Sequence, residues 1–294
     1  MAGSSIGNFF RVTTWGESHG KGIGVVVDGC PAGLVLEEEM IQKLLNRRKP
    51  GSNPYGTKRS EGDRVEIYSG IFEGKTTGTP ISMMIPNEDQ RSKDYGEIAS
   101  YYRPGHADYT FDQKFGFRDY RGGGRSSGRE TIGRVAAGAI AKEILKELGI
   151  QVTAYTKSIG EISIDYTKCS KESIKDSVFC MPDLEASKQA ELLLQEKMSQ
   201  MDSVGGVVEC IVEGMPPGVG APVFDKLDAN LAKAVMSIGA VKGFEIGDGF
   251  LASKSTGYEN NDFFKKGKNG NLEKESNHAG GILGGISDGS EIIV

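Results

Sequence analysis

The segment of residues 131–148 constrains the fold more than any other part of the sequence. Its apolar residues recur at helical spacing, and Gly149 follows where a helix would end. Ser127 and Glu130 have the spacing of a capping box, in which a hydroxyl and a carboxylate accept from N–H groups at a helix start. The sequence therefore predicts a well-bounded amphipathic helix directly after a loop rich in glycine and arginine. Its apolar stripe comprises Ile132, Val135, Ala136, Ala139, Ile140, Ile144 and Leu148.

The remaining segments predict a mixture of short strands and helices. The 42 glycines are spread along the 294 residues, so the chain is not of low complexity. β-Branched segments indicate strands, and segments with a helical apolar period indicate helices. The expected strands are 23–27, 65–68, 81–85, 207–212 and 291–294. The expected helices are 37–47, 131–148, 185–199 and 226–236. The polar stretch 256–276 is expected to be a mobile excursion.

Residues 27–34 and 212–219 resemble each other. Each segment follows a valine-rich strand and precedes an amphipathic helix, and each helix leads into a glycine loop that carries a lysine. One interpretation is a pair of related strand–turn–helix units within one domain, in which the backbones of 24–48 and 208–238 superpose. Chance similarity of two strand-ending turns is the alternative.

Composition narrows the class of partner. The formal net charge is −5, which disfavours general affinity for nucleic acid or acidic membranes. Positive charge is nevertheless concentrated at residues 47–49, 58–59 and 118–134, which indicates binding of small anions. No signal-peptide pattern and no apolar run of membrane-spanning length is found, so a cytoplasmic protein without a membrane partner is expected. The cysteines lack metal-binding spacing and are expected to be reduced and mostly buried: Cys30, Cys169, Cys180 and Cys210.

Two histidines stand in glycine-containing turns. His19 lies between glycines, where the backbone can approach a ligand closely. His106 follows a Pro-Gly turn, with Arg103 and Asp108 close enough to set its charge. Imidazole can transfer a proton near neutral pH, so both are catalytic candidates. A structural role for His19 and a loop salt bridge around His106 are the alternatives.

The segment 118–129 combines three successive glycines with arginines and serines. Converging backbone N–H groups at a helix start form an anion cradle. The segment matches neither a Walker A loop nor the dinucleotide fingerprint, and an RNA-binding RGG tail is disfavoured because a helix follows at once. The cations in residues 47–51 either contact an anion or stabilise the end of the preceding helix through its dipole. Residues 277–285 offer a glycine-lined surface for a flat ring, with His278 there either functional or structural.

Five segments resemble the signatures of the chorismate synthase family, in the family's order and across nearly the whole chain. They are GESHGKGIGVVVDGCP (16–31), RPGHAD (103–108), DYRGGGRSSGR (119–129), MSIGAVKG (236–243) and NHAGGILGG (277–285). The resemblance implies an α+β fold, a β-α-β sandwich with helices between two antiparallel sheets. It also implies a single domain over residues 1–294 and assembly as a homotetramer.

The resemblance further implies the activity and the roles of individual residues. The reaction is the 1,4-elimination of phosphate from 5-enolpyruvylshikimate-3-phosphate to give chorismate, with reduced FMN as cofactor, NADPH as a candidate reductant and no metal. His19 is implied to assist departure of the phosphate, and His106 to protonate or hydrogen-bond the reduced flavin. Arg48 and Arg134 are implied contacts for the phosphate of the substrate or of the nicotinamide. The implied FMN-binding residues are Arg125, Ser126, Ser127, Gly239, Ala240 and Gly284.

Two departures from the family pattern leave alternatives open. Pro54 stands where relatives often have an arginine, for which Lys58 or Arg59 are candidate replacements. The sequence ends at Val294, before the family's Lys-Pro-Thr and Arg-x-Asp-Pro segments, so part of the flavin pocket is expected to be lacking. A catalytically weak FMN- or substrate-binding protein of the same family is therefore the alternative function. A flavin reductase or nicotinamide dehydrogenase is disfavoured because a dinucleotide fingerprint after a strand is not found.

Overall fold

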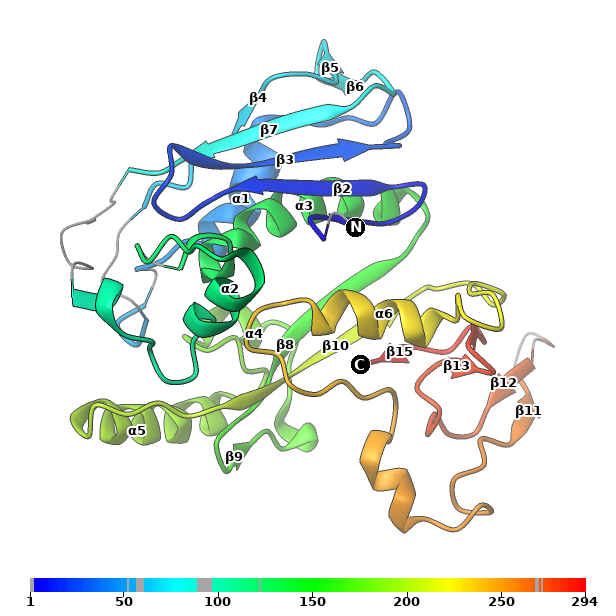
Figure 1. Cartoon of the computed structure of the whole chain (residues 1–294). Coiled ribbons are helices and arrows are strands. Elements are labelled where there is room, and N and C mark those ends of the chain that lie inside the picture. Colours follow the sequence, from blue (N-terminus) through cyan, green and yellow to red (C-terminus); the bar gives the residue numbers. More distant parts are fainter. Residues whose placement is uncertain are drawn as a thin grey trace. The chain divides into compact units, whose positions relative to one another are not determined.

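The computed structural model describes residues 3–51, 53–56, 61–88, 97–121, 123–267, 270 and 272–294. The chain divides into two compact units (Figure 1). The first unit comprises Met1–Ile144 with Ile238–Ala240, and the second comprises Leu145–Ser237 with Val241–Val294. The single-domain organisation expected from the sequence stays a prediction.

The first unit is built on an antiparallel sheet that has five strands in the described ranges. Alternate residues of its central strands are apolar and buried, as a half-buried strand requires. Helices α1 (Glu38–Arg48) and α3 (Thr131–Glu147) cover one face and share a continuous apolar core with these strands (Figure 1). The strands, in sheet order, are β1 (Ser5–Ile6), β2 (Arg11–Gly16), β3 (Gly22–Asp28), β7 (Ile81–Pro86) and β4 (Glu66–Ile67). A small hairpin of β5 (Ile71–Phe72) and β6 (Lys75–Thr76) and helix α2 (Asp108–Phe115) complete the named elements.

The start of α3 differs from the predicted capping box. The hydroxyl of Ser127 accepts from the N–H of Arg129 at 3.3 Å and so caps a short 3₁₀ turn, Gly128–Glu130, that leads into the helix. The N–H of Ser127 donates to the carbonyl of Gly124 at 3.4 Å, and the Glu130 carboxylate accepts from Arg134 at 2.9 Å. The cap is therefore confirmed, but the reciprocal half of the box is wrong, because an arginine one turn later takes the carboxylate.

Helix α3 ends just before Gly149, as the sequence predicts. Gly149 has a φ of 74°, a left-handed conformation that glycine adopts without steric penalty. The N–H of Ile150 then donates to the carbonyl of Leu145 at 2.9 Å and closes the last turn.

The second unit contains a second antiparallel sheet, in the order β15–β10–β8–β9 for the described strands. Helix α5 (Leu184–Ser199) packs beside this sheet and is capped by Asp183, whose side chain accepts from two backbone N–H groups. The strands are β8 (Gln151–Ile159), β9 (Ile162–Ser163), β10 (Gly206–Glu213) and β15 (Ile292–Ile293). The smaller elements are α4 (Ser173–Asp176), α6 (Leu227–Met236), β11 (Phe264–Lys266), β12 (Leu272–Lys274), β13 (Ile282–Leu283) and β14 (Ile286–Ser287).

The α+β class with antiparallel sheets is thus confirmed, and the predicted strands and helices all coincide with observed elements. The strand–turn–helix order recurs as β3–α1 and β10–α6, while the superposition of the two segments stays a prediction. The excursion expected at 256–276 is wrong in part, because β11 and β12 pair there as a hairpin. The cysteines are free, but only Cys30 is buried and Cys180 is exposed, which corrects the expectation of mostly buried thiols.

Candidate active site

His106 is held by a network of charges at the start of α2. Gly105 turns the chain, and α2 begins two residues after the histidine, at the buried Asp108. The carboxylate of Asp108 accepts from Nε of Arg103 at 2.8 Å. It also forms an ion pair with Arg118, with Nη1 at 2.9 Å, and lies 3.1 Å from Nδ1 of His106. The hydrogen bond from Arg103 holds the pKa of Asp108 well below its usual range. Nη2 of Arg103 lies 3.2 Å from Nδ1 of His106, which therefore accepts from the guanidinium. Arg103 and Asp108 both lie beside His106, as the RPGHAD segment predicts.

The opposite edge of the same imidazole faces a serine-bearing turn. A Cβ added at Gly123 would lie 2.9 Å from Cε1 and 3.0 Å from Nε2 of His106, and 3.0 Å from Oγ of Ser126. Gly123 also has a φ of 86°, which disfavours any side chain there. The hollow between α2 and this turn measures about 10 Å³, room for one water at most. One edge of the ring therefore faces Asp108 and Arg103, and the other faces Gly123.

His19 lies in the turn that joins β2 to β3. The N–H of Gly20 donates to the carbonyl of Glu17 at 3.1 Å and closes the turn. Nδ1 of His19 lies 3.0 Å from the hydroxyl of Ser18, and both side chains are buried. A buried imidazole with one nitrogen assigned to a hydroxyl has a defined orientation, which a proton-transferring group requires.

The turn of His19 lies beside the glycine- and arginine-rich segment. A Cβ added at Gly124 would lie 3.9 Å from Cγ of Glu17. The hydrogen bond from Arg121 lowers the pKa of Asp119, and positive charge on the nearby His19 acts in the same direction. The structure therefore brings His19, His106 and the segment 119–127 together within the first unit.

Arg125 anchors this segment to the sheet. Its guanidinium donates to the carbonyl of Gly16 at 3.1 Å, and to the carbonyl and hydroxyl of Thr14 at 3.3 and 2.7 Å. These acceptors are uncharged, so the contacts leave the positive charge of Arg125 uncancelled. The hydroxyl of Ser126 donates to the carbonyl of Gly123 at 2.7 Å, within the 3₁₀ turn Gly124–Ser126.

Arg48 and Arg134 reach the start of α3, but each is paired with a carboxylate. Nη1 of Arg48 lies 2.7 Å from the fully buried Asp63, and its Nε donates to the hydroxyl of Thr131 at 3.2 Å. Nε of Arg134 lies 2.9 Å from Glu130. A phosphate at either arginine would therefore share the guanidinium with an existing carboxylate partner.

The other predicted flavin contacts are backbone positions. Gly239 and Ala240 belong to the first unit, and Ala240 is left-handed with a φ of 70°. Gly284 belongs to the second unit, in the turn between β13 and β14. A Cβ added at Gly239 or at Gly284 would meet no heavy atom within 4 Å. His278, in the same glycine-rich segment as Gly284, pairs through Nδ1 with Asp248 at 2.7 Å.

The sequence missed the partners that organise the site. Asp63 and Asn87 contact the arginine-rich segment, although they precede it in the chain by some tens of residues. Their only sequence signal is a polar side chain beside a strand end, which many surface residues share. Pro54 lies in a described turn, whereas Lys58 and Arg59, its candidate replacements, lie outside the described residues.

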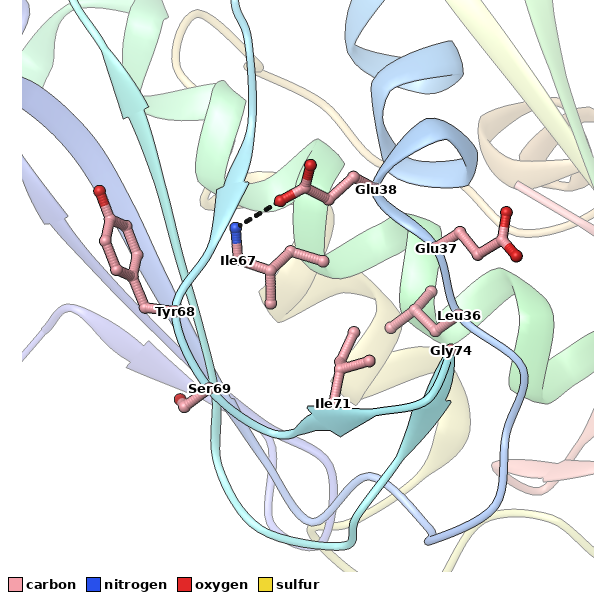
Figure 2. Close-up of a pocket in the computed structure, with 8 residues that line it drawn as sticks. All are labelled: Leu36, Glu37, Glu38, Ile67, Tyr68, Ser69, Ile71 and Gly74. Atoms are coloured by element: carbon pink, nitrogen blue, oxygen red, sulfur yellow. Dashed lines mark hydrogen bonds between the residues drawn. The ribbon is translucent and has the colours of Figure 1, made fainter.

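A separate hollow of about 450 Å³ opens at the edge of the first unit's sheet (Figure 2). Glu38 accepts from the N–H of Ile67 at 3.0 Å there, and the Glu37 side chain points away from the other lining residues (Figure 2). The lining includes these carboxylates and contains none of the predicted site residues. An acidic rim repels a phosphate, so this hollow is not the candidate anion site.

The part of the chain that the structure describes shows neither a metal-binding cluster nor a membrane-spanning helix. No group of three or more histidine, cysteine or carboxylate side chains there is placed to hold a metal ion. Among the same residues, each helix is either too short or too polar to cross a membrane.

Two oriented histidines lie beside an arginine- and glycine-rich turn on an α+β scaffold, an arrangement suited to binding an anion and transferring a proton. A profile described as chorismate synthase matches residues 10–294. The chain is 71% identical over 293 residues to the chorismate synthase of Lachnoclostridium phytofermentans, covering 100% of this chain and 80% of that relative. It is 66% identical to that of Lachnospira eligens, again over 100% of this chain and 80% of the relative.

The fold comparison agrees. A solved structure described as chorismate synthase matches with a TM-score of 0.82 and 33% identity, covering 97% of this chain and 83% of that one. The chain therefore belongs to the chorismate synthase family, as the sequence resemblance implied. It is accordingly an enzyme of the lyase class.

Proposed function

We propose that this chain converts 5-enolpyruvylshikimate-3-phosphate to chorismate and phosphate with the help of reduced FMN, a step of aromatic amino acid biosynthesis. The observation that carries the proposal is the convergence of His19 and His106 on the turn that contains Ser126. The substrate loses a proton from C6 and phosphate from C3, so the site must manage a proton and a leaving anion.

The described residues fit a flavin mononucleotide. In the first unit, Gly239 presents open backbone surface, against which a flat ring can pack. The start of α3 offers its partial positive charge to a phosphate group, and Arg125 adds a charge that its own contacts do not cancel. Reduced FMN bound there would supply electron density to the reacting ring and accept the C6 proton.

His106 is suited to hold or donate a proton at Nε2. Nδ1 accepts from Nη2 of Arg103 at 3.2 Å, which leaves Nε2 to carry the proton of the neutral ring. His106 can therefore donate to a basic atom placed over the turn at Gly123.

His19 and the arginines are suited to the leaving phosphate. The buried imidazole of His19 can donate a proton or a hydrogen bond to the departing oxygen, which makes phosphate a better leaving group. Arg48 and Arg134 can neutralise the anion if they share their guanidinium groups with Asp63 and Glu130. Removing these arginines should raise KM more than it lowers the proton-transfer rate.

The proposal is tested by anaerobic titration of the purified chain with oxidised and photoreduced FMN, followed by turnover assays. A site with uncancelled positive charge should bind the reduced, more anionic flavin more tightly. Equal affinity for both forms, or FMN binding without turnover, would favour a catalytically weak binding protein of the same family. NADPH as reductant, a homotetrameric assembly and a cytoplasmic location stay predictions.

A further inference from the structure

Asn87 braces the turn that carries His19. It follows directly after β7, and its backbone N–H donates to the carbonyl of Lys21 at 3.1 Å. Its side-chain Nδ2 donates to the carbonyl of Glu17 at 2.9 Å and to the carbonyl of Gly20 at 2.8 Å. These carbonyls flank His19 on both sides, so one amide fixes both ends of the turn.

The same amide is tied to the anion cradle. Oδ1 of Asn87 accepts from Nε of Arg129 at 3.0 Å. The Arg129 side chain is buried and lies 3.1 Å from Asp63, and its backbone N–H donates to the hydroxyl of Ser127 at 3.3 Å. A continuous path of hydrogen bonds thus runs from the cradle through Arg129 and Asn87 to the turn of His19.

An amide suits this position better than other side chains of its size. Asn87 uses both donors of Nδ2 and the acceptor Oδ1 at once. Aspartate would keep the acceptor for Arg129 but would turn a carboxylate toward two carbonyl oxygens. Leucine would bond to neither partner. Asn87 therefore bridges the His19 turn and Arg129. Closing the turn alone would need only the two bonds from Nδ2.

We propose that Asn87 is a positioning residue that couples anion binding at Ser127–Arg129 to the placement of the His19 imidazole. This inference rests on the proposed function, in which His19 assists the departing phosphate. Removal of the bridge should leave the cradle in place and let the His19 turn move.

The chain contains three histidines, so ¹⁵N-histidine labelling gives ring signals that single substitutions assign. The probe is oxidised FMN, added to wild type, Asn87→Ala, Asn87→Asp and the control Asn230→Ala. Asn230, in α6 of the second unit, makes the same kind of amide-to-carbonyl bond, at 3.2 Å to Lys226 just before the helix. Thermal unfolding of each variant checks that it is folded.

In wild type and Asn230→Ala, FMN should shift the ring signals of His19. In both Asn87 variants FMN should still bind, but the His19 signals should no longer respond. Turnover should fall by about 10- to 100-fold in kcat, with KM unchanged, as for other residues that orient a functional group. Asn87→Asp should be as impaired as Asn87→Ala although it keeps the Arg129 contact.

Three outcomes would overturn the inference. The first is a wild-type His19 signal that ignores FMN, and the second is an Asn87→Asp variant with wild-type kcat and a normal His19 response. The third is a loss confined to KM. If the wild type makes no chorismate, the proposed function fails. The ring signals still test whether FMN binding is coupled to His19, because they do not depend on turnover.

Discussion

Replacing Gly123 by alanine tests whether the turn holds the His106 ring where the chemistry needs it. The new Cβ would lie 2.9 Å from Cε1 and 3.0 Å from Nε2 of that ring, closer than the optimum of about 3.5–4.0 Å for such contacts. The φ of 86° also costs a residue with a side chain roughly 1–2 kcal/mol. We therefore expect a loss of about 1–2 kcal/mol in the free energy of unfolding and a displaced imidazole. Because misplacement by about 1 Å can cost about 10²-fold, kcat should fall by up to that factor.

Gly116→Ala is the matched control. Gly116 ends α2 with a φ of 70°, and a Cβ added there would meet no heavy atom within 4 Å. This variant should show the same loss in urea denaturation without the loss in kcat. The reasoning would be refuted if Gly123→Ala kept wild-type kcat, or if both variants lost turnover equally.

Three further predictions address single groups. His106→Ala should lower kcat by about 10²–10⁴-fold with the fold intact by circular dichroism, and unchanged turnover would remove His106 from the mechanism. Ser127→Ala should destabilise the chain by about 1 kcal/mol and weaken FMN binding in fluorescence titrations, whereas equal affinity would place the cradle elsewhere. Burial raises the pKa of Asp262, but hydrogen bonds from Ala279, Ser276 and His278 outweigh this and lower it from 3.8 to about 2. The folded state then binds fewer protons than the unfolded state, so the stability from this group is present above about pH 4 and is lost as pH falls toward about 2. Asp262→Asn should weaken this fall of stability with pH, measured as the midpoint of urea unfolding across that range. An unchanged fall in the variant would mean that other carboxylates cause it.

The sequence was sufficient for elements whose own residues carry the signal. The stripe of α3 and the left-handed Gly149 are local features, and their bounds were predicted to within a residue. Strand β8 was missed because its side chains are largely polar. In the structure its Tyr155 lies opposite Glu209 of β10 and donates to it at 2.6 Å. The partner that satisfies this polar side chain of β8 therefore lies far along the chain, and the local sequence pattern does not indicate it.

The same limit applies to the site. Motifs identified His19, His106 and the segment 119–129, because glycine and imidazole in short turns are local signals. The resemblance implied Arg48 and Arg134 as phosphate contacts, and the sequence did not indicate that each is paired with a carboxylate, Asp63 and Glu130 respectively. Those pairings, and the role of Asn87, depend on where the sheet brings strand ends together. Periodicity and spacing along one segment do not contain that information.

Anaerobic incubation of this chain with 5-enolpyruvylshikimate-3-phosphate and photoreduced FMN tests the central claim most directly. Chorismate is followed by its absorbance and phosphate by a colorimetric assay in the same samples. We predict equimolar chorismate and phosphate with no net consumption of reduced flavin. Absence of both products from a folded, FMN-binding sample would contradict the proposed activity of this chain.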